Sequence, residues 1–195
     1  MALSFNPMQT TQPASSFLLQ SDGYVQGAFF DDPSARLWLA TGYIAYAVTQ
    51  PIWGAMAITE LVPTSNQLGN ELELATTVAN TTAFTVFNQA SNMIITPGNT
   101  VQQADAGMTV SYFRLGSNAR IAVQCDPTLA GTLDGGATNQ EVLWDFTNQK
   151  LITYTSGTAL PVKVLSVNTN SKIVSYNSGT GALTWTTGAC AIIQI

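Results

Sequence analysis

Short runs of β-branched and aromatic residues, separated by turn residues, constrain the fold of this 195-residue chain more than any other feature. Beyond Glu60 the runs alternate with clusters such as Thr-Pro-Gly-Asn and Gly-Ser-Asn, which favour turns. Repeated short strands at such spacing are typical of an antiparallel β-sandwich or barrel. The sequence therefore predicts a mainly β body over residues 22–127, with strands at Leu72–Val78, Ala83–Phe87, Met108–Leu115 and Arg120–Cys125.

The region 128–195 reads as a small C-terminal β-barrel or sandwich unit, either separate or integrated with the main body. It opens with a glycine-rich stretch and continues with an alternating segment that ends at Phe146 and turns back at Leu151, as a hairpin does. Together with this hairpin, the expected strands are Leu160–Val167, Lys172–Tyr176, Ala182–Thr186 and Ala189–Ile195.

One short helix is expected near 33–40. Asp32 is suited to cap the first amides, Pro33 to occupy the first helical position, and Gly42 to end the helix.

The chain carries no charge from Leu37 to Ile58, which raises a membrane-spanning segment as an alternative. Gln50 and Pro51 lie in the middle of this stretch, where lipid would offer their polar groups no partner. We therefore expect no membrane association, and instead two buried strands, Tyr43–Thr49 and Ile52–Ile58.

Residues 1–21 are rich in Gln, Ser, Thr and Pro, with isolated Phe5, Met8 and Phe17. Such a composition cannot collapse by itself but can lie along a neighbouring surface. The sequence predicts an extended N-terminal arm whose apolar residues make contacts. Residues 1–20 lack the basic region and the continuous apolar core of a secretory signal, so folding in the cytoplasm is expected.

The charge composition excludes several functions. Six basic residues, scattered among eleven acidic ones, cannot form the cationic track that nucleic acid requires. The chain has no histidine, which removes the usual general base and the commonest metal ligand. Cys125 and Cys190 are far apart in sequence and read as reduced core residues, with a disulfide as the alternative.

Carboxylates are the remaining catalytic candidates, because a pair of them can act as acid and base. Asp22, Asp31 and Asp32 cluster in sequence, but the last two are better explained as a turn and a helix cap. No calcium loop, dinucleotide fingerprint or phosphate loop is present. We expect no enzymatic activity and no cofactor or metal.

Two kinds of side chain are candidates for recognition. Trp53 and the other three tryptophans offer flat apolar faces for a carbohydrate, although tryptophans in alternating strands more often lie in a core or an interface. Arg114 and Arg120 flank a turn between two strands, where a guanidinium can fork a carboxylate or carbonyl within the fold or across an interface.

Several segments resemble the structural cement, or head decoration, proteins of tailed bacteriophages. The resemblance runs from about Asp22 to Asp126 and more loosely through Trp144-Asp145-Phe146 and the C-terminal strands. It rests on Asp22-Gly23-Tyr24-Val25-Gln26-Gly27, Asp32-Pro33, Pro51-Ile52-Trp53-Gly54, Phe84-Thr85-Val86-Phe87-Asn88-Gln89-Ala90, Gly107-Met108-Thr109-Val110 and Phe113-Arg114-Leu115-Gly116-Ser117-Asn118-Ala119-Arg120-Ile121-Ala122-Val123.

The resemblance implies a virion protein that sits on the outer face of the capsid and bridges neighbouring capsomers. Its partners would be the major capsid protein and further copies of itself, as a dimer or trimer, and no catalytic residue is implied. A polar, weakly charged β protein with an arm suits many modest contacts repeated by symmetry. The alternatives are a carbohydrate- or receptor-binding module of a phage tail or adhesin, and a carboxylate-based glycan hydrolase.

Overall fold

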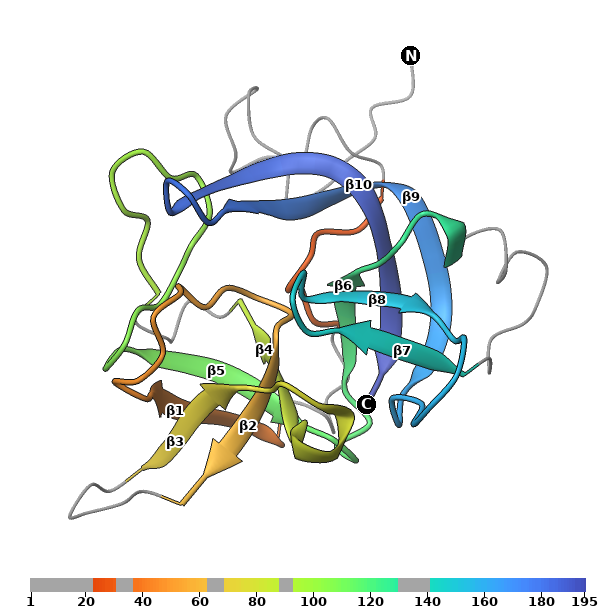
Figure 1. Cartoon of the computed structure of the whole chain (residues 1–195), viewed down its shortest axis with the longest axis horizontal. Helices are drawn as coiled ribbons and strands as arrows, with labels where there is room; N and C mark the ends of the chain where they lie inside the picture. Colours follow the sequence, from red (N-terminus) through yellow and green to blue (C-terminus); the bar gives the residue numbers. More distant parts are fainter. Residues whose placement is uncertain (1–22, 31–36, 63–68, 88–92, 130–140) are drawn as a thin grey trace.

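A computed structural model of the chain describes residues 23–30, 37–62, 69–87, 93–129 and 141–195. Its first part is a closed barrel with the strand order β1-β3-β2-β4-β5 (Figure 1). Neighbouring strands are antiparallel except for β1 and β3, which run parallel. The strands are β1 (Leu39–Ile44), β2 (Ala57–Leu61), β3 (Asn70–Leu74), β4 (Ala83–Val86) and β5 (Thr109–Arg114), with one 3-10 turn, η2 (Val78–Asn80), before β4.

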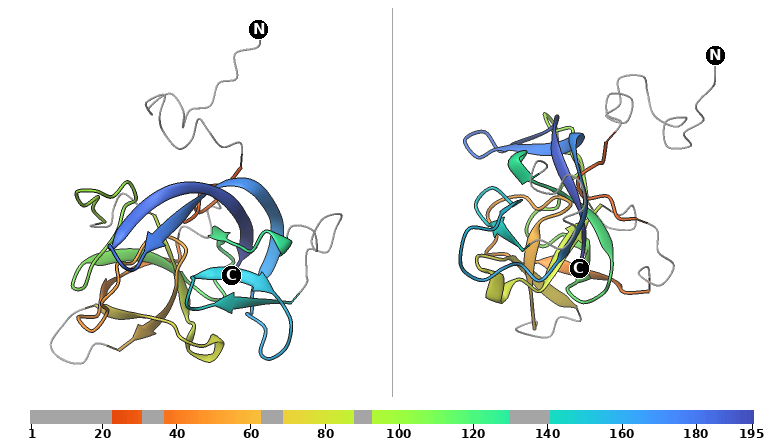
Figure 2. Two further views of the ribbon diagram at one scale, coloured as in Figure 1. Left: turned by 45° about the horizontal axis from the view of Figure 1, so that its top comes forward. Right: turned by 90° about the vertical axis from the view of Figure 1, so that its right-hand side faces the viewer.

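The second part is built from two further sheets. One is three-stranded in the order β6-β10-β9, and the other is a hairpin of β7 and β8. The long hairpin of β9 and β10 arches over the rest of the molecule, as Figure 2 shows from two further sides. The strands are β6 (Arg120–Gln124), β7 (Val142–Asp145), β8 (Lys150–Thr153), β9 (Lys163–Asn177) and β10 (Ala182–Gln194).

The mainly β prediction is confirmed, but the C-terminal strands are longer than expected. Turns expected at Asn168-Thr169-Asn170 and at Thr187-Gly188 lie inside β9 and β10 instead. The register between these strands shifts at Gly188, whose missing side chain leaves room for Ile173 of the paired strand. A glycine and a bulge let one strand bend where two strands with a turn were expected.

Two hydrophobic cores hold the molecule together. The first fills the barrel and includes Ile44, Ile58, Leu72 and Tyr112. The second lies between the outer face of the barrel and the C-terminal strands, and includes Phe84, Phe113, Trp144, Leu151 and Ile193. Strand β10 also pairs with β6, so the strands of 141–195 share a sheet and a core with the preceding part of the chain.

Residues 23–30 form a strap across the edges of the three-stranded sheet. Val25 makes a parallel bridge to Lys172 in β9, and Phe29 an antiparallel one to Ile121 in β6. In the middle of the strap Gly27 has a φ of 80°. A Cβ on Gly27 would lie 2.5 Å from the Phe87 ring and 2.7 Å from the Cα of Gly54. Glycine is therefore required at this crossing for both conformation and space.

The helix expected near 33–40 is wrong in its last part. Leu37 and Trp38 form a turn, and β1 begins at Leu39; residues 31–36 lie outside the described ranges. From Leu39 on, β5 supplies backbone partners, which local capping signals do not reveal.

The strands expected at Tyr43–Thr49 and Ile52–Ile58 are also displaced. Strand β1 ends at Ile44, the chain then turns, and β2 begins at Ala57. No helix among the described residues is long and apolar enough to cross a membrane.

Candidate interaction surface

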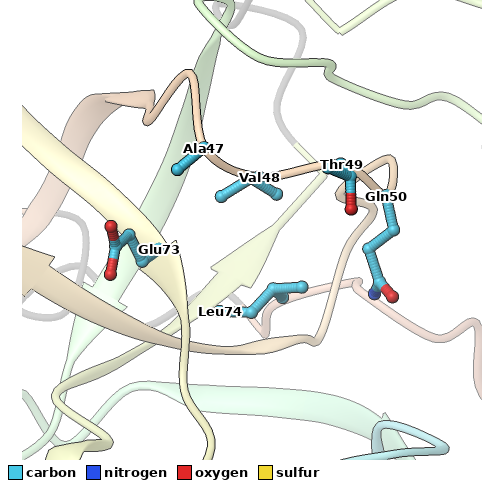
Figure 3. Close-up of a pocket in the computed structure, with 6 residues that line it drawn as sticks. All are labelled: Ala47, Val48, Thr49, Gln50, Glu73 and Leu74. Carbon is cyan, nitrogen blue, oxygen red and sulfur yellow. The ribbon is translucent and has the colours of Figure 1, made fainter.

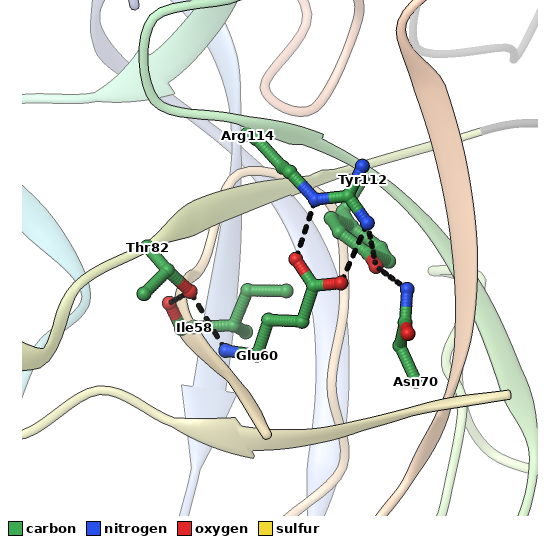
Figure 4. A network of polar contacts seen from close by, with 6 residues as sticks. All are labelled: Ile58, Glu60, Asn70, Thr82, Tyr112 and Arg114. Carbon is green, nitrogen blue, oxygen red and sulfur yellow. Dashed lines mark hydrogen bonds and ion pairs between the residues drawn. The ribbon is translucent and has the colours of Figure 1, made fainter. Parts of the chain in front are cut away.

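Four polar side chains meet at one end of the barrel, which we call the Arg114 end. The strand directions bring together the end of β2, the end of β5 and the start of β3. Arg114 donates from Nε and Nη2 to the two carboxylate oxygens of Glu60, each at 2.6 Å (Figure 4). The hydroxyl of Tyr112 accepts from the Asn70 amide at 2.8 Å and from Arg114 Nη2 at 3.4 Å. This network closes the barrel interior with paired polar groups.

The bidentate ion pair between Glu60 and Arg114, which we call the fork, stabilises the ionised form of both side chains. The hydrogen bonds from Arg114 lower the pKa of the Glu60 carboxyl, against the opposite effect of its partial burial. The same hydrogen bonds raise the pKa of Arg114. Burial raises the pKa of the Tyr112 hydroxyl, so this group remains protonated. A fixed ion pair of this kind holds a surface in shape but supplies no group that exchanges protons near neutral pH.

Large apolar side chains surround the Arg114 end and are exposed to solvent. Leu37 and Trp38 precede β1 and are 85% and 63% exposed, and Val62, directly after β2, is 86% exposed. The antiparallel register pairs Leu39 with Phe113, so Trp38, directly before β1, and Arg114, at the end of β5, lie at the same end of the barrel. Tryptophan, arginine and exposed aliphatic residues in one place are typical of protein interfaces.

The opposite end of the barrel, which we call the Tyr46 end, carries a second apolar group. Tyr46 follows β1 and is 76% exposed, with its ring against Gly107. Ile94 and Ile95 are 46% and 57% exposed, and Ile94 bridges to Gln103, close in sequence to Gly107. The two apolar groups therefore lie at opposite ends of the same barrel.

An open hollow of about 310 Å³ adjoins the Tyr46 end (Figure 3). It is lined by Ala47, Val48, Thr49, Gln50, Glu73 and Leu74. A single carboxylate among aliphatic and amide groups provides no acid/base pair.

Three of the four tryptophans are used in packing. Trp53 is 5% exposed and packs against Tyr176, with the ring centroids 5.4 Å apart. Trp144 packs edge-on against Phe84, and Trp185 against Phe87. Trp38 alone is strongly exposed, so the four side chains do not form a common carbohydrate platform.

The other sequence candidates are distributed over the molecule. Arg114 forks a carboxylate within the fold, one of the two possibilities considered for it. Arg120 begins β6, and its exposed side chain forms no ion pair with the described residues. Phe5, Met8 and Phe17 of the expected arm lie outside the described ranges, as do Asp22, Asp31 and Asp32.

The two cysteines are free and buried. Cys125 shares the second core with Ala189 and Ala191, and Cys190 lies between these alanines on β10. Since neighbouring residues of a strand point to opposite faces, the thiols point away from each other. The described residues hold no group of three or more acidic or cysteine side chains suited to a metal ion.

Gln149 lies in the turn between β7 and β8, and no role was expected for it from the sequence. Its buried side chain accepts from the Ala57 amide at 3.0 Å and from the Trp144 indole at 3.3 Å. It also donates to the Phe146 carbonyl at 2.8 Å. Gln149 thereby fastens the β7–β8 hairpin to the barrel, and a polar residue in a hairpin turn gives no sign of such a distant acceptor role.

Compared with protein-family models, with curated proteins and with solved structures, the chain shows no match.

Proposed function

We propose that this chain is a non-enzymatic structural protein of a phage virion, which binds the outside of the capsid and cements neighbouring capsomers. The proposal starts from the resemblance of its sequence segments to head decoration proteins. Its partners would be the major capsid protein and other copies of the chain.

The observation that carries the proposal is the pair of exposed apolar groups at opposite ends of one barrel. A protein that bridges two neighbours needs at least two separate contact surfaces on a stiff body. Leu37, Trp38 and Val62 supply one surface, and Tyr46 and the Ile94-Ile95 pair supply the other. The barrel between them is closed and filled, so the distance between the surfaces is fixed.

The charge pattern also supports a binding role. The chain has a net charge of -5 with few charged residues, and the fork at the Arg114 end neutralises one of its six basic side chains. Long-range attraction therefore contributes little, and contact between shaped, weakly polar surfaces must provide the affinity.

The test is the number of copies of the chain in gradient-purified phage particles, measured by quantitative mass spectrometry against the major shell protein. We expect a copy number comparable to that of the shell protein. A handful of copies per particle would instead assign the chain to the tail and favour receptor binding. Absence from particles would overturn the proposal.

A further inference from the structure

The barrel wall has a seam on the side of the hollow. Strands β1 and β3 pair only over Gly42–Ile44 with Asn70–Leu72. One further hydrogen bond follows, from the Ala45 amide to the Leu72 carbonyl at 2.9 Å. The chain then turns, and Val48 donates back to the Ala45 carbonyl. Past Leu72, strand β3 therefore has no neighbouring strand on this side among the residues that the structure describes.

The backbone of Leu74 faces this seam. On the other side of β3, the Ala75 amide donates to the Ala57 carbonyl, so Ala75 and Ala57 form a hydrogen-bonded pair. In an antiparallel ladder, such pairs alternate with pairs that exchange no hydrogen bond. The Leu74–Ile58 pair therefore exchanges no hydrogen bonds, consistent with the Ile58 carbonyl accepting from the amide of Thr82, directly before β4. Within the described part of the chain, no group bonds to the Leu74 amide or carbonyl. A donor and an acceptor are therefore presented at an open strand edge.

The hollow gives this open edge a shape and a charge. Figure 3 shows Val48 across from Leu74, with Glu73 toward one side and Gln50 toward the other. Both aliphatic side chains are only partly buried, so the space between them fits a further aliphatic side chain. Glu73 forms no ion pair with any described residue. Its carboxylate favours an occupant that carries a basic residue next to the aliphatic one.

We propose that the hollow binds an extended segment of a protein partner. The segment pairs its main chain with the Leu74 amide and carbonyl, inserts an aliphatic side chain between Val48 and Leu74, and places a lysine or arginine against Glu73. This is strand addition to an open sheet edge, in which main-chain bonds give affinity and side-chain contacts give specificity. The inference rests on the proposed function, for which it names an attachment point.

The direct test uses the capped peptide Ac-Thr-Lys-Val-Lys-Val-Thr-NH2 and amide NMR spectra of the isotope-labelled full chain. We expect saturable shifts of the Leu74 amide and of its neighbours along the hollow. A peptide with glutamate in place of both lysines should bind about 2–5-fold more weakly, the range of an exposed ion pair. A peptide N-methylated at its first valine should lose binding, because that residue can no longer donate its main-chain hydrogen bond to the Leu74 carbonyl.

Two variants of the chain complete the test. Ala47→Trp fills the hollow from an exposed position, and Thr186→Trp, on the exposed side of β10, is its matched control. Both should melt at the wild-type temperature. The first should show no peptide shifts, and the control should bind normally. Unchanged binding by Ala47→Trp, or equal binding of the N-methylated peptide, would overturn the inference.

Attachment to shells stripped of the protein separates this inference from the proposed function. If the wild-type chain and Ala47→Trp attach equally well, the docking site is wrong and the capsid function is retained. If the chain is absent from particles while the peptide still shifts Leu74, the capsid function is wrong and the docking site is retained.

Discussion

At the scale of single residues, the Glu60–Arg114 fork combines good geometry with exposure. Its two short hydrogen bonds are ideal for a carboxylate and a guanidinium, but the Arg114 side chain is 49% exposed. Solvent therefore screens the pair. We expect Glu60→Gln to lower the free energy of unfolding at pH 7 by only about 0.5–1 kcal/mol, measured by urea titration.

The cost of Glu60→Gln should depend on pH. Because the fork lowers the pKa of Glu60 in the folded chain, its stabilisation is fully present above the ordinary carboxyl pKa of about 4.3. It is lost as the pH falls through the lowered pKa of the folded state. The difference between wild type and variant should therefore shrink toward pH 3. Glu71→Gln, which removes a carboxylate without an ion pair to any described residue, should show a smaller difference at pH 7.

The two buried cysteines should be unreactive in the folded chain. Burial raises the pKa of Cys125 to about 12 and also raises that of Cys190, so little thiolate forms in the folded chain. Ellman's reagent should label neither thiol in native buffer and both in denaturant. Diamide should form no intramolecular disulfide, because the thiols point to opposite faces of the sheet. A mass loss corresponding to two hydrogens would contradict this placement.

At the scale of elements, the strap across the three-stranded sheet depends on the crossing of Gly27 over Gly54. An alanine at position 27 would have to adopt the left-handed backbone conformation, and its methyl group would clash with the Phe87 ring. Gly116 is a matched control, since its φ is 87° and a Cβ there would meet nothing within 4 Å. We expect Gly27→Ala to cost about 1–3 kcal/mol more than Gly116→Ala in urea unfolding. Equal costs would show that the strap tolerates the added methyl group.

At the scale of the whole molecule, the proposed bridging of capsomers would require both ends of the barrel. We expect Trp38→Ser at the Arg114 end and Ile95→Ser at the Tyr46 end to leave the melting temperature nearly unchanged, because both side chains are exposed. Each variant should still weaken retention of the chain on purified shells at low concentration, as the loss of one of two linked contacts predicts. Ser156→Ala, at another exposed position, is the control. Full retention by both variants would exclude the apolar ends as attachment surfaces.

Local sequence patterns determined much of the architecture. Strands β4, β5 and β6 begin and end within one residue of their expected limits, because alternation and turn residues act over short distances. The same patterns misplaced β1, where Asp32-Pro33 favoured a helix, and divided β9 and β10 at polar segments. Strand β1 takes its backbone partners from the distant strand β5, whereas the polar segments of β9 and β10 pair with each other across one long hairpin. In both places pairing between strands overrode local preference.

The sequence by itself determined the β class of the fold, the scarcity of charge and the absence of histidine as a general base. It also indicated that Arg114 pairs with a carboxylate or carbonyl. Only the tertiary structure decided that Glu60 is its partner, that Trp53 is buried while Trp38 is exposed, and that the seam leaves Leu74 open. The physical reason is the same for each. Composition and periodicity are local properties, whereas ion pairs, burial and strand edges depend on which distant segments the closed barrel brings together.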